Sequence, residues 1–225
     1  MSETGAHLSG KRLRTPRAAA LAGIIFALLL STSYILIRFA IPSNPADGGI
    51  WLQERAGSAS FALSLVPFAG IAFLWFMGVI RDRLGYLEDQ FFSTVFYGSG
   101  ILFLAMTFIS AALAGAILSS YAIEPSIMIE SGLYTYARQV MHQVLNIFGI
   151  RMAGVFMFSL ATIWIRTGIV NRYLAYLTFI SATILLLVIS LNLWIILVFP
   201  VWVFVISVYI LVLNLRMRPE LQESD

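Results

Sequence analysis

Long apolar runs with almost no charged residue recur along this chain of 225 residues and limit the folds it can adopt. A bilayer core about 30 Å thick is crossed by a helix of about 20 apolar residues. Six runs approach this length, and we expect each to form a membrane-spanning helix: 18–41, 59–80, 91–119, 149–165, 173–190 and 195–215. The predicted fold is therefore all-α, a polytopic integral membrane bundle of about six transmembrane helices that forms one domain over residues 18–215.

Composition supports a lipid environment and narrows the chemistry. The chain is 60% hydrophobic and 11% charged, with a mean hydropathy of +0.91, so it has too little polar surface to cover a water-soluble core of this size. It contains no cysteine, which excludes disulfides, thiolate metal sites and cysteine nucleophiles. The first apolar run is longer than the core of a signal peptide, about 7–15 residues, so we interpret it as a retained span.

Basic residues predict the orientation of the bundle. With both ends of the chain inside, four of the 14 Lys and Arg residues lie on or near the outer side, namely Arg38, Arg55, Arg138 and Arg151, and the other ten lie inside. Positively charged residues favour the cytoplasmic side. We therefore expect cytoplasmic tails at 1–17 and 216–225, and we read the net charge of +3 as a topology signal and not as a nucleic-acid footprint.

One segment is unusually polar for this chain. At 100° per residue, its polar side chains fall within an arc of about 140°, which predicts an amphipathic helix over about 133–148; they are Thr135, Arg138, Gln139, His142, Gln143 and Asn146. The simplest arrangement places this helix in the outer interface, with a bend near Gly149 into the fourth span. The alternative lets it enter the bundle, so that a polar vestibule forms from Arg138, His142, Asn146 and Arg151, with Arg38, Glu124 or Glu130 nearby.

Sites for catalysis, metals or cofactors are not expected. His142 has no second histidine in the bundle, because His7 lies in the cytoplasmic tail, which argues against a bis-histidine haem. Ser99 is predicted near the inner half of the third span, far from His142, so the pair cannot form an activated nucleophile. We predict no catalytic residue, no bound cofactor and no metal ligand.

Two sequence features leave structural questions open. The segment "GVIRDRLGYL" at 78–87 aligns with "GIVNRYLAYL" at 168–177, either through a duplicated hairpin or through the shared composition of two inner turns. Pro67 and Gly70 in the second span either break the helix to present carbonyls to an ion or act as ordinary kink residues.

Two functional hypotheses remain from the sequence. The first is a structural or accessory membrane component without catalytic activity, and the second is a small transporter or channel with an outer vestibule around 135–151. The lipid bilayer is the expected environment, with a second copy of the chain or another membrane protein as partner and no nucleic acid. Compactness and the basic bias predict a bacterial plasma membrane.

Overall fold

The computed structural model describes residues 15–41, 51–84, 90–187 and 193–216, and the expected all-α bundle is confirmed, with no strand in these ranges. The elements in chain order are α1 (Thr15–Ala40), α2 (Trp51–Glu54), α3 (Ala56–Leu84), α4 (Gln90–Ile123), α5 (Pro125–Glu130), α6 (Leu133–Gln143), the π-helical turn η1 (Val144–Gly149), α7 (Ile150–Thr167), α8 (Arg172–Leu187), the 3-10 turn η2 (Leu193–Leu197) and α9 (Val198–Arg216).

The described helices fit a multi-pass membrane protein. Five of them are long and apolar enough to cross a bilayer, and they correspond to the first, second, third, fourth and sixth predicted spans. The fifth predicted span corresponds to α8, which is shorter at 16 residues, and its predicted end at 190 lies outside the described residues. Residues 191 and 192, between the fifth and sixth predicted spans, also lie outside them. Pro200 is the third residue of α9, where a missing amide hydrogen costs little.

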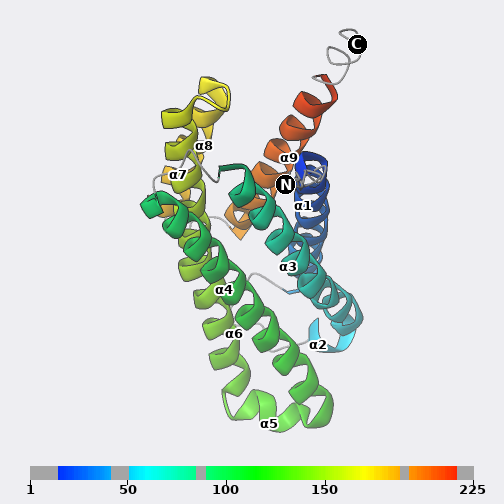
Figure 1. Cartoon of the computed structure of the whole chain (residues 1–225). Coiled ribbons are helices and arrows are strands. Elements are labelled where there is room, and N and C mark those ends of the chain that lie inside the picture. Colours follow the sequence, from blue (N-terminus) through cyan, green and yellow to red (C-terminus); the bar gives the residue numbers. More distant parts are fainter. Residues whose placement is uncertain (1–14, 42–50, 85–89, 188–192, 217–225) are drawn as a thin grey trace, which may run out of the picture.

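The helices alternate in direction, so the two ends of the described chain lie at the same end of the bundle (Figure 1). We call this the inner end, following the predicted orientation, and the opposite end the outer end. Helix α1 packs mainly on α3 and α9, whereas α4 packs on α7, α3 and α6, and α8 packs on α7. Helix α4 has 34 residues and a length of about 51 Å, so it forms with α5 and α6 a hairpin at the outer end (Figure 1).

An aromatic core connects five helices of the bundle. Phe73 on α3 lies 4.6 Å from Phe26 on α1 and 5.5 Å from Phe156 on α7, measured between ring centroids. Phe103 on α4 and Phe199 on α9 are 4.6 Å apart. All five rings are buried, and pairs at these separations gain energy beyond the area that they bury. The centre of the bundle is therefore closely packed across α1, α3, α4, α7 and α9.

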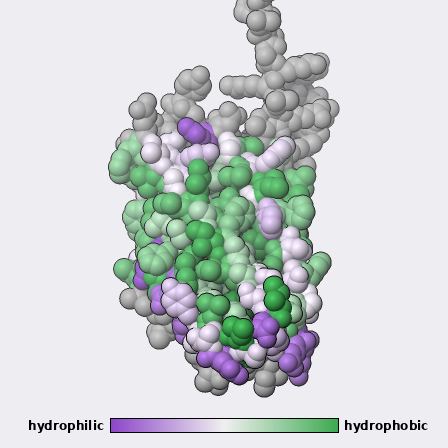
Figure 2. All heavy atoms as spheres, turned by 90° about the horizontal axis from the view of Figure 1, so that it is seen from below, coloured by the Kyte–Doolittle hydropathy of each residue, from purple (hydrophilic) through white to green (hydrophobic). Residues whose placement is uncertain are grey.

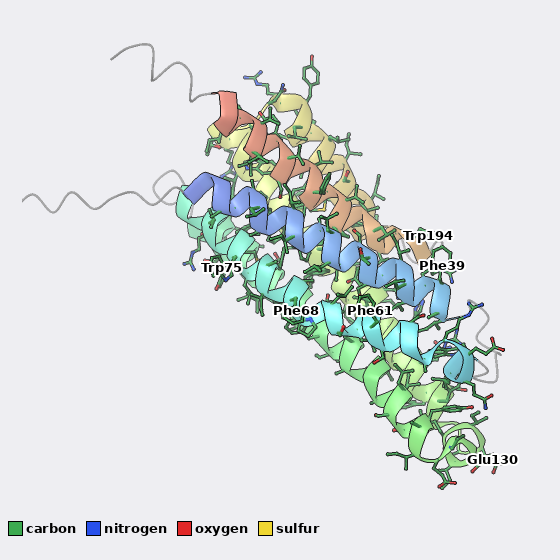
Figure 3. All side chains as sticks on the ribbon, turned by 90° about the vertical axis from the view of Figure 1, so that its right-hand side faces the viewer. Phe39, Phe61, Phe68, Trp75, Glu130 and Trp194 are labelled. Carbon is green, nitrogen blue, oxygen red and sulfur yellow. The ribbon has the colours of Figure 1, made fainter. Side chains whose placement is uncertain are left out.

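The outside of the bundle is apolar along its length. On α3, Phe61, Phe68 and Trp75 are spaced seven residues apart, and each exposes more than half of its surface (Figure 3). Near the C-terminal end of α1, the exposed ring of Phe39 lies 6.3 Å from the ring of Trp194. A helix that is apolar on its outward face as well as on its inward face suits a lipid environment.

The two similar inner segments do not share one local structure. Gly78 is an interior residue of α3. Gly168 instead follows the end of α7 in the left-handed conformation, with φ of 68°, and donates to the carbonyl of Trp164. The aligned glycines therefore occupy different structural positions, which favours shared composition over a duplicated hairpin.

Candidate functional site

The polar segment forms a continuation of α7 and not a separate helix bent away from it. The expected bend near Gly149 is absent, because the backbone there stays helical, with φ of −60° and ψ of −49°. Helix α6 passes through the π-helical turn η1 into α7 and lies along the outer part of α4 (Figure 1). The length of α4 explains this difference, since it offers α6 a protein surface beyond the predicted third span.

The polar arc of this segment divides into two rows. Thr135, Gln139 and Gln143 are exposed. Arg138, His142 and Asn146 are only partly exposed, and all three line a cavity of about 140 Å³. Residues four apart lie on the same face of a helix, so each row forms one stripe. The inward stripe therefore carries the groups predicted for a vestibule.

The cavity lies between α1, α3, α4, α6, η1 and η2, and we call it the outer vestibule. Sixteen residues line it, and among these described residues none is acidic. The polar lining residues are Tyr34, Arg38, Thr107, Ser110, Arg138, His142 and Asn146, and the apolar ones are Ile37, Ile41, Leu63, Val66, Ala111, Ala114, Met141, Leu145 and Ile196. Seen from the outer end, hydrophilic residues gather toward one edge of the molecule, and apolar residues cover much of the rest (Figure 2).

Two residues of α1 that line the vestibule carry buried donors without a protein acceptor. Tyr34 is 6% exposed, and its hydroxyl lies close to Thr107 but forms no hydrogen bond of normal geometry. One turn along the helix, the Nε of Arg38 is also buried without an acceptor. A buried donor left without a partner costs about 1–3 kcal/mol. A ligand that brings an acceptor to either atom would remove this cost.

Other polar atoms of the lining are already occupied within the protein. The hydroxyl of Thr107 donates to the carbonyl of Phe103 at 2.9 Å, and that of Ser110 donates across to the carbonyl of Met141 at 3.2 Å. The side-chain amide of Asn146 donates to the carbonyl of its own helix at His142, at 3.1 Å. The lining atoms buried without an acceptor are thus the hydroxyl of Tyr34 and the Nε of Arg38.

Arg138 is held in place by two aromatic side chains. The indole nitrogen of Trp51 donates to the hydroxyl oxygen of Tyr134 at 2.8 Å, and a guanidinium nitrogen of Arg138 donates to the same oxygen at 3.3 Å. The guanidinium also lies 5.9 Å from the centre of the Tyr134 ring. Trp51 and Tyr134 are both buried, so the short helix α2 fixes one end of the inward stripe.

The fourth predicted vestibule residue lies elsewhere. Arg151 does not line the cavity, and one of its guanidinium nitrogens donates to the carbonyl of Ile147 at 2.8 Å. Glu124 and Glu130 are exposed outside the lining, and Glu130 sits at the outer tip of the molecule (Figure 3). Of the neighbours considered from the sequence, only Arg38 is part of the vestibule.

Sequence reasoning did not single out Tyr34 as a site residue. Its signal is the spacing to Arg38, because a tyrosine and an arginine four residues apart near the end of an apolar run share one helix face.

The interior contains other polar groups that serve packing: the hydroxyl of Ser99 donates to the carbonyl of Phe96 at 3.0 Å. Within the described ranges, no group of three or more His, Asp or Glu side chains could hold a metal ion.

Comparison of the chain with protein-family models, with curated proteins and with solved structures finds no match.

Proposed function

We propose that this membrane protein binds a small anionic ligand in the outer vestibule and acts as a receptor or carrier for it. The observation that carries the proposal is the pair of unpartnered donors, the hydroxyl of Tyr34 and the Nε of Arg38, in a cavity whose described lining has no carboxylate. An anion accepts hydrogen bonds and can satisfy both donors at once.

The charges around the cavity favour the same ligand class. Arg38 and Arg138 contribute guanidinium groups to it from α1 and α6. Two unit charges 4 Å apart interact by about 4 kcal/mol at an effective dielectric constant of 20, attractive for an anion and repulsive for a cation. The vestibule should therefore concentrate anions and exclude cations.

Movement of a ligand through the bundle would require a change in its core. A second cavity, apolar and about 70 Å³ in volume, lies toward the inner end and is lined by residues such as Ile80, Trp164 and Tyr209. The buried ring of Phe73, packed against Phe103, belongs to the aromatic core that separates the two cavities. A receptor needs only the vestibule, whereas a carrier needs this core to open.

A structural or accessory role without a ligand is the competing proposal. Its supporting observation is that hydroxyl groups along the helices mostly bond to carbonyls of their own helix, as Thr162 does with Phe158 and Thr167 with Ile163. Such groups stabilise packing and leave nothing to bind. The unpartnered donors of the vestibule depart from this pattern, and so we favour ligand binding.

Charged thiol reagents test the proposal without knowledge of the ligand. The chain has no cysteine, so Ser110→Cys places a single thiol in the vestibule, and Ser119→Cys places a matched thiol on the exposed part of the same helix. We expect the rate ratio of an anionic to a cationic methanethiosulfonate reagent to be at least about tenfold higher at position 110 than at position 119, because of the Coulomb energies above.

Adding Arg38→Gln to Ser110→Cys should lower this ratio several-fold, since it removes one cation of the vestibule. Equal ratios at positions 110 and 119 would contradict anion binding and favour the structural or accessory role. A ratio that stays high after Arg38→Gln would show that Arg38 does not create the preference.

A further inference from the structure

Resting on the proposed anion site, we infer that the ligand of the outer vestibule is an amphiphile, with one oxyanion group, a carboxylate or a phosphate, on an apolar chain. The vestibule contains a small number of strong hydrogen-bond donors, and its lining is otherwise mostly apolar. A dissolved inorganic anion and an anionic amphiphile share the oxyanion, and the composition of the lining distinguishes between them.

Every helix around the vestibule contributes apolar side chains to its lining, and two of them also contribute an arginine. The arginines belong to α1 and α6, whereas α3 contributes only Leu63 and Val66 to the cavity. Helix α4 adds the small side chains Ala111 and Ala114, which leave the space between these walls open. Nine of the 16 lining residues are apolar. A ligand that fills the cavity therefore meets apolar surface over much of its own area.

An inorganic anion would lose more than it gains in this cavity. An anion that leaves water must replace its hydration with hydrogen bonds. The hydroxyls of Thr107 and Ser110 and the amide of Asn146 already donate to backbone carbonyls. The donors left in the lining suffice for one oxyanion edge, and the apolar remainder is matched only by a hydrocarbon chain.

The dimensions of the vestibule suit a head group and the first part of a chain. Its lining extends from Tyr34 to Ile41 on α1 and from Thr107 to Ala114 on α4, seven residues or about 10 Å in each case. Its volume of about 140 Å³ is close to that of the engineered cavity, about 150 Å³, that holds benzene. The head and several methylene groups fit inside, and the rest of a longer chain extends outside.

The cavity lies between α1 and α6, which pack mainly on other helices. Helix α1 packs on α3 and α9, and α6 packs on α4 and η1. Leu145 of η1 and Ile196 of η2 line this side, so the boundary between the two groups of helices is apolar. A chain that leaves the vestibule here would pass from protein into lipid without crossing a polar surface.

Protection of the thiol at position 110 tests the inference. Single-cysteine Ser110→Cys protein in phosphatidylcholine nanodiscs is incubated with dodecanoate, dodecyl phosphate, dodecanol, acetate or inorganic phosphate, and the rate of thiol modification is then measured. We expect the two anionic amphiphiles to slow modification at concentrations at least about tenfold lower than the neutral alcohol or the small anions. Ser119→Cys reports any general effect of the amphiphiles on the bilayer and should not change.

Two variants in the Ser110→Cys background separate the head from the chain. Arg38→Gln should weaken protection by dodecanoate about tenfold and leave protection by dodecanol unchanged. Leu63→Ser, at a partly exposed position, should weaken the protection by dodecanoate several-fold. It should preserve the preference of the thiol for anionic reagents. Ile37→Asn serves the same purpose if Leu63→Ser does not fold.

The possible outcomes distinguish this inference from the function on which it rests. Protection by acetate or phosphate as strong as that by dodecanoate overturns the amphiphile and leaves the anion site standing. Protection by dodecanol equal to that by dodecanoate overturns both. The absence of protection by any compound, with the reagent preference intact, overturns the amphiphile alone.

Discussion

Among the described glycines, Gly23 on α1 leaves the least room for an added side chain. A methyl group added there would lie 2.0 Å from the hydroxyl of Ser207 on α9 and 2.7 Å from the ring of Phe76 on α3. Carbon atoms in contact are normally about 3.5 Å apart, so the ring would have to move by about 0.8 Å. Because Phe76 is completely buried, its neighbours would have to move with it.

Overpacking of this kind costs about 1–3 kcal/mol, so we expect Gly23→Ala to lower the free energy of unfolding by about 2 kcal/mol. The matched control is Gly115→Ala on α4, where an added methyl group meets no atom within 4 Å. It should leave stability unchanged or raise it by up to about 1 kcal/mol, since alanine favours the helix over glycine.

A double-mutant cycle assigns the cost to its two sources. The hydroxyl of Ser207 is buried without a hydrogen bond, so Ser207→Ala alone should be neutral or slightly stabilising. Combined with Gly23→Ala, it should recover part of the lost stability, because only the contact with Phe76 remains. Unfolding in mixed micelles, followed by circular dichroism, measures all four proteins. If Gly23→Ala is as harmless as Gly115→Ala, the close packing of α1 against α3 and α9 is wrong.

Two further substitutions test local features of the fold by the same unfolding measurement. Gly168→Ala should cost about 1–2 kcal/mol because φ is 68° there, whereas Gly78→Ala, at the aligned helical position, should cost nothing; equal effects would contradict the different roles of the two glycines. Thr178→Val should cost about 1–3 kcal/mol because it leaves the buried indole nitrogen of Trp202, which donates to Thr178 at 2.9 Å, without an acceptor. The control Thr183→Val, whose hydroxyl bonds only within its own helix, should change stability by less than about 0.5 kcal/mol, and a similar loss in both variants would exclude a special role for the indole bond.

Hydropathy predicted the apolar helices well and their ends less well. The third predicted span ends at 119, but α4 continues to Ile123, and the fourth begins at 149, but its helix continues from Leu133. Hydropathy reports how well a segment suits lipid, and a helix does not have to end where it leaves the apolar region. The amphipathic pattern predicted the helix over about 133–148, but the pattern of a single segment does not reveal that this helix packs on α4.

The candidate site was predictable only on the helix that carries most of its polarity. The spacing of Arg138, His142 and Asn146 indicated one stripe, but Arg151 lies about 140° from Asn146 at 100° per residue and does not line the cavity. The α1 side of the vestibule depends on contacts between residues about 100 positions apart in the chain. Such contacts follow from packing, and no local pattern in the sequence encodes them.

The rotation of α6 places part of its polar face against the bundle. Tyr134, Arg138, His142 and Asn146 follow one another at intervals of four, and on a regular helix each is turned about 40° from the one before. Arg138 therefore faces nearly the same way as Tyr134, and the other two lie progressively further round. Tyr134 is buried and accepts a hydrogen bond from Trp51 on α2, which fixes that direction toward the bundle. A helix that only served solubility at the outer end would gain most by turning its arginine and histidine to water and its exposed Tyr136 inward. Helix α6 does the opposite, and a polar ligand in the vestibule is a reason for that arrangement.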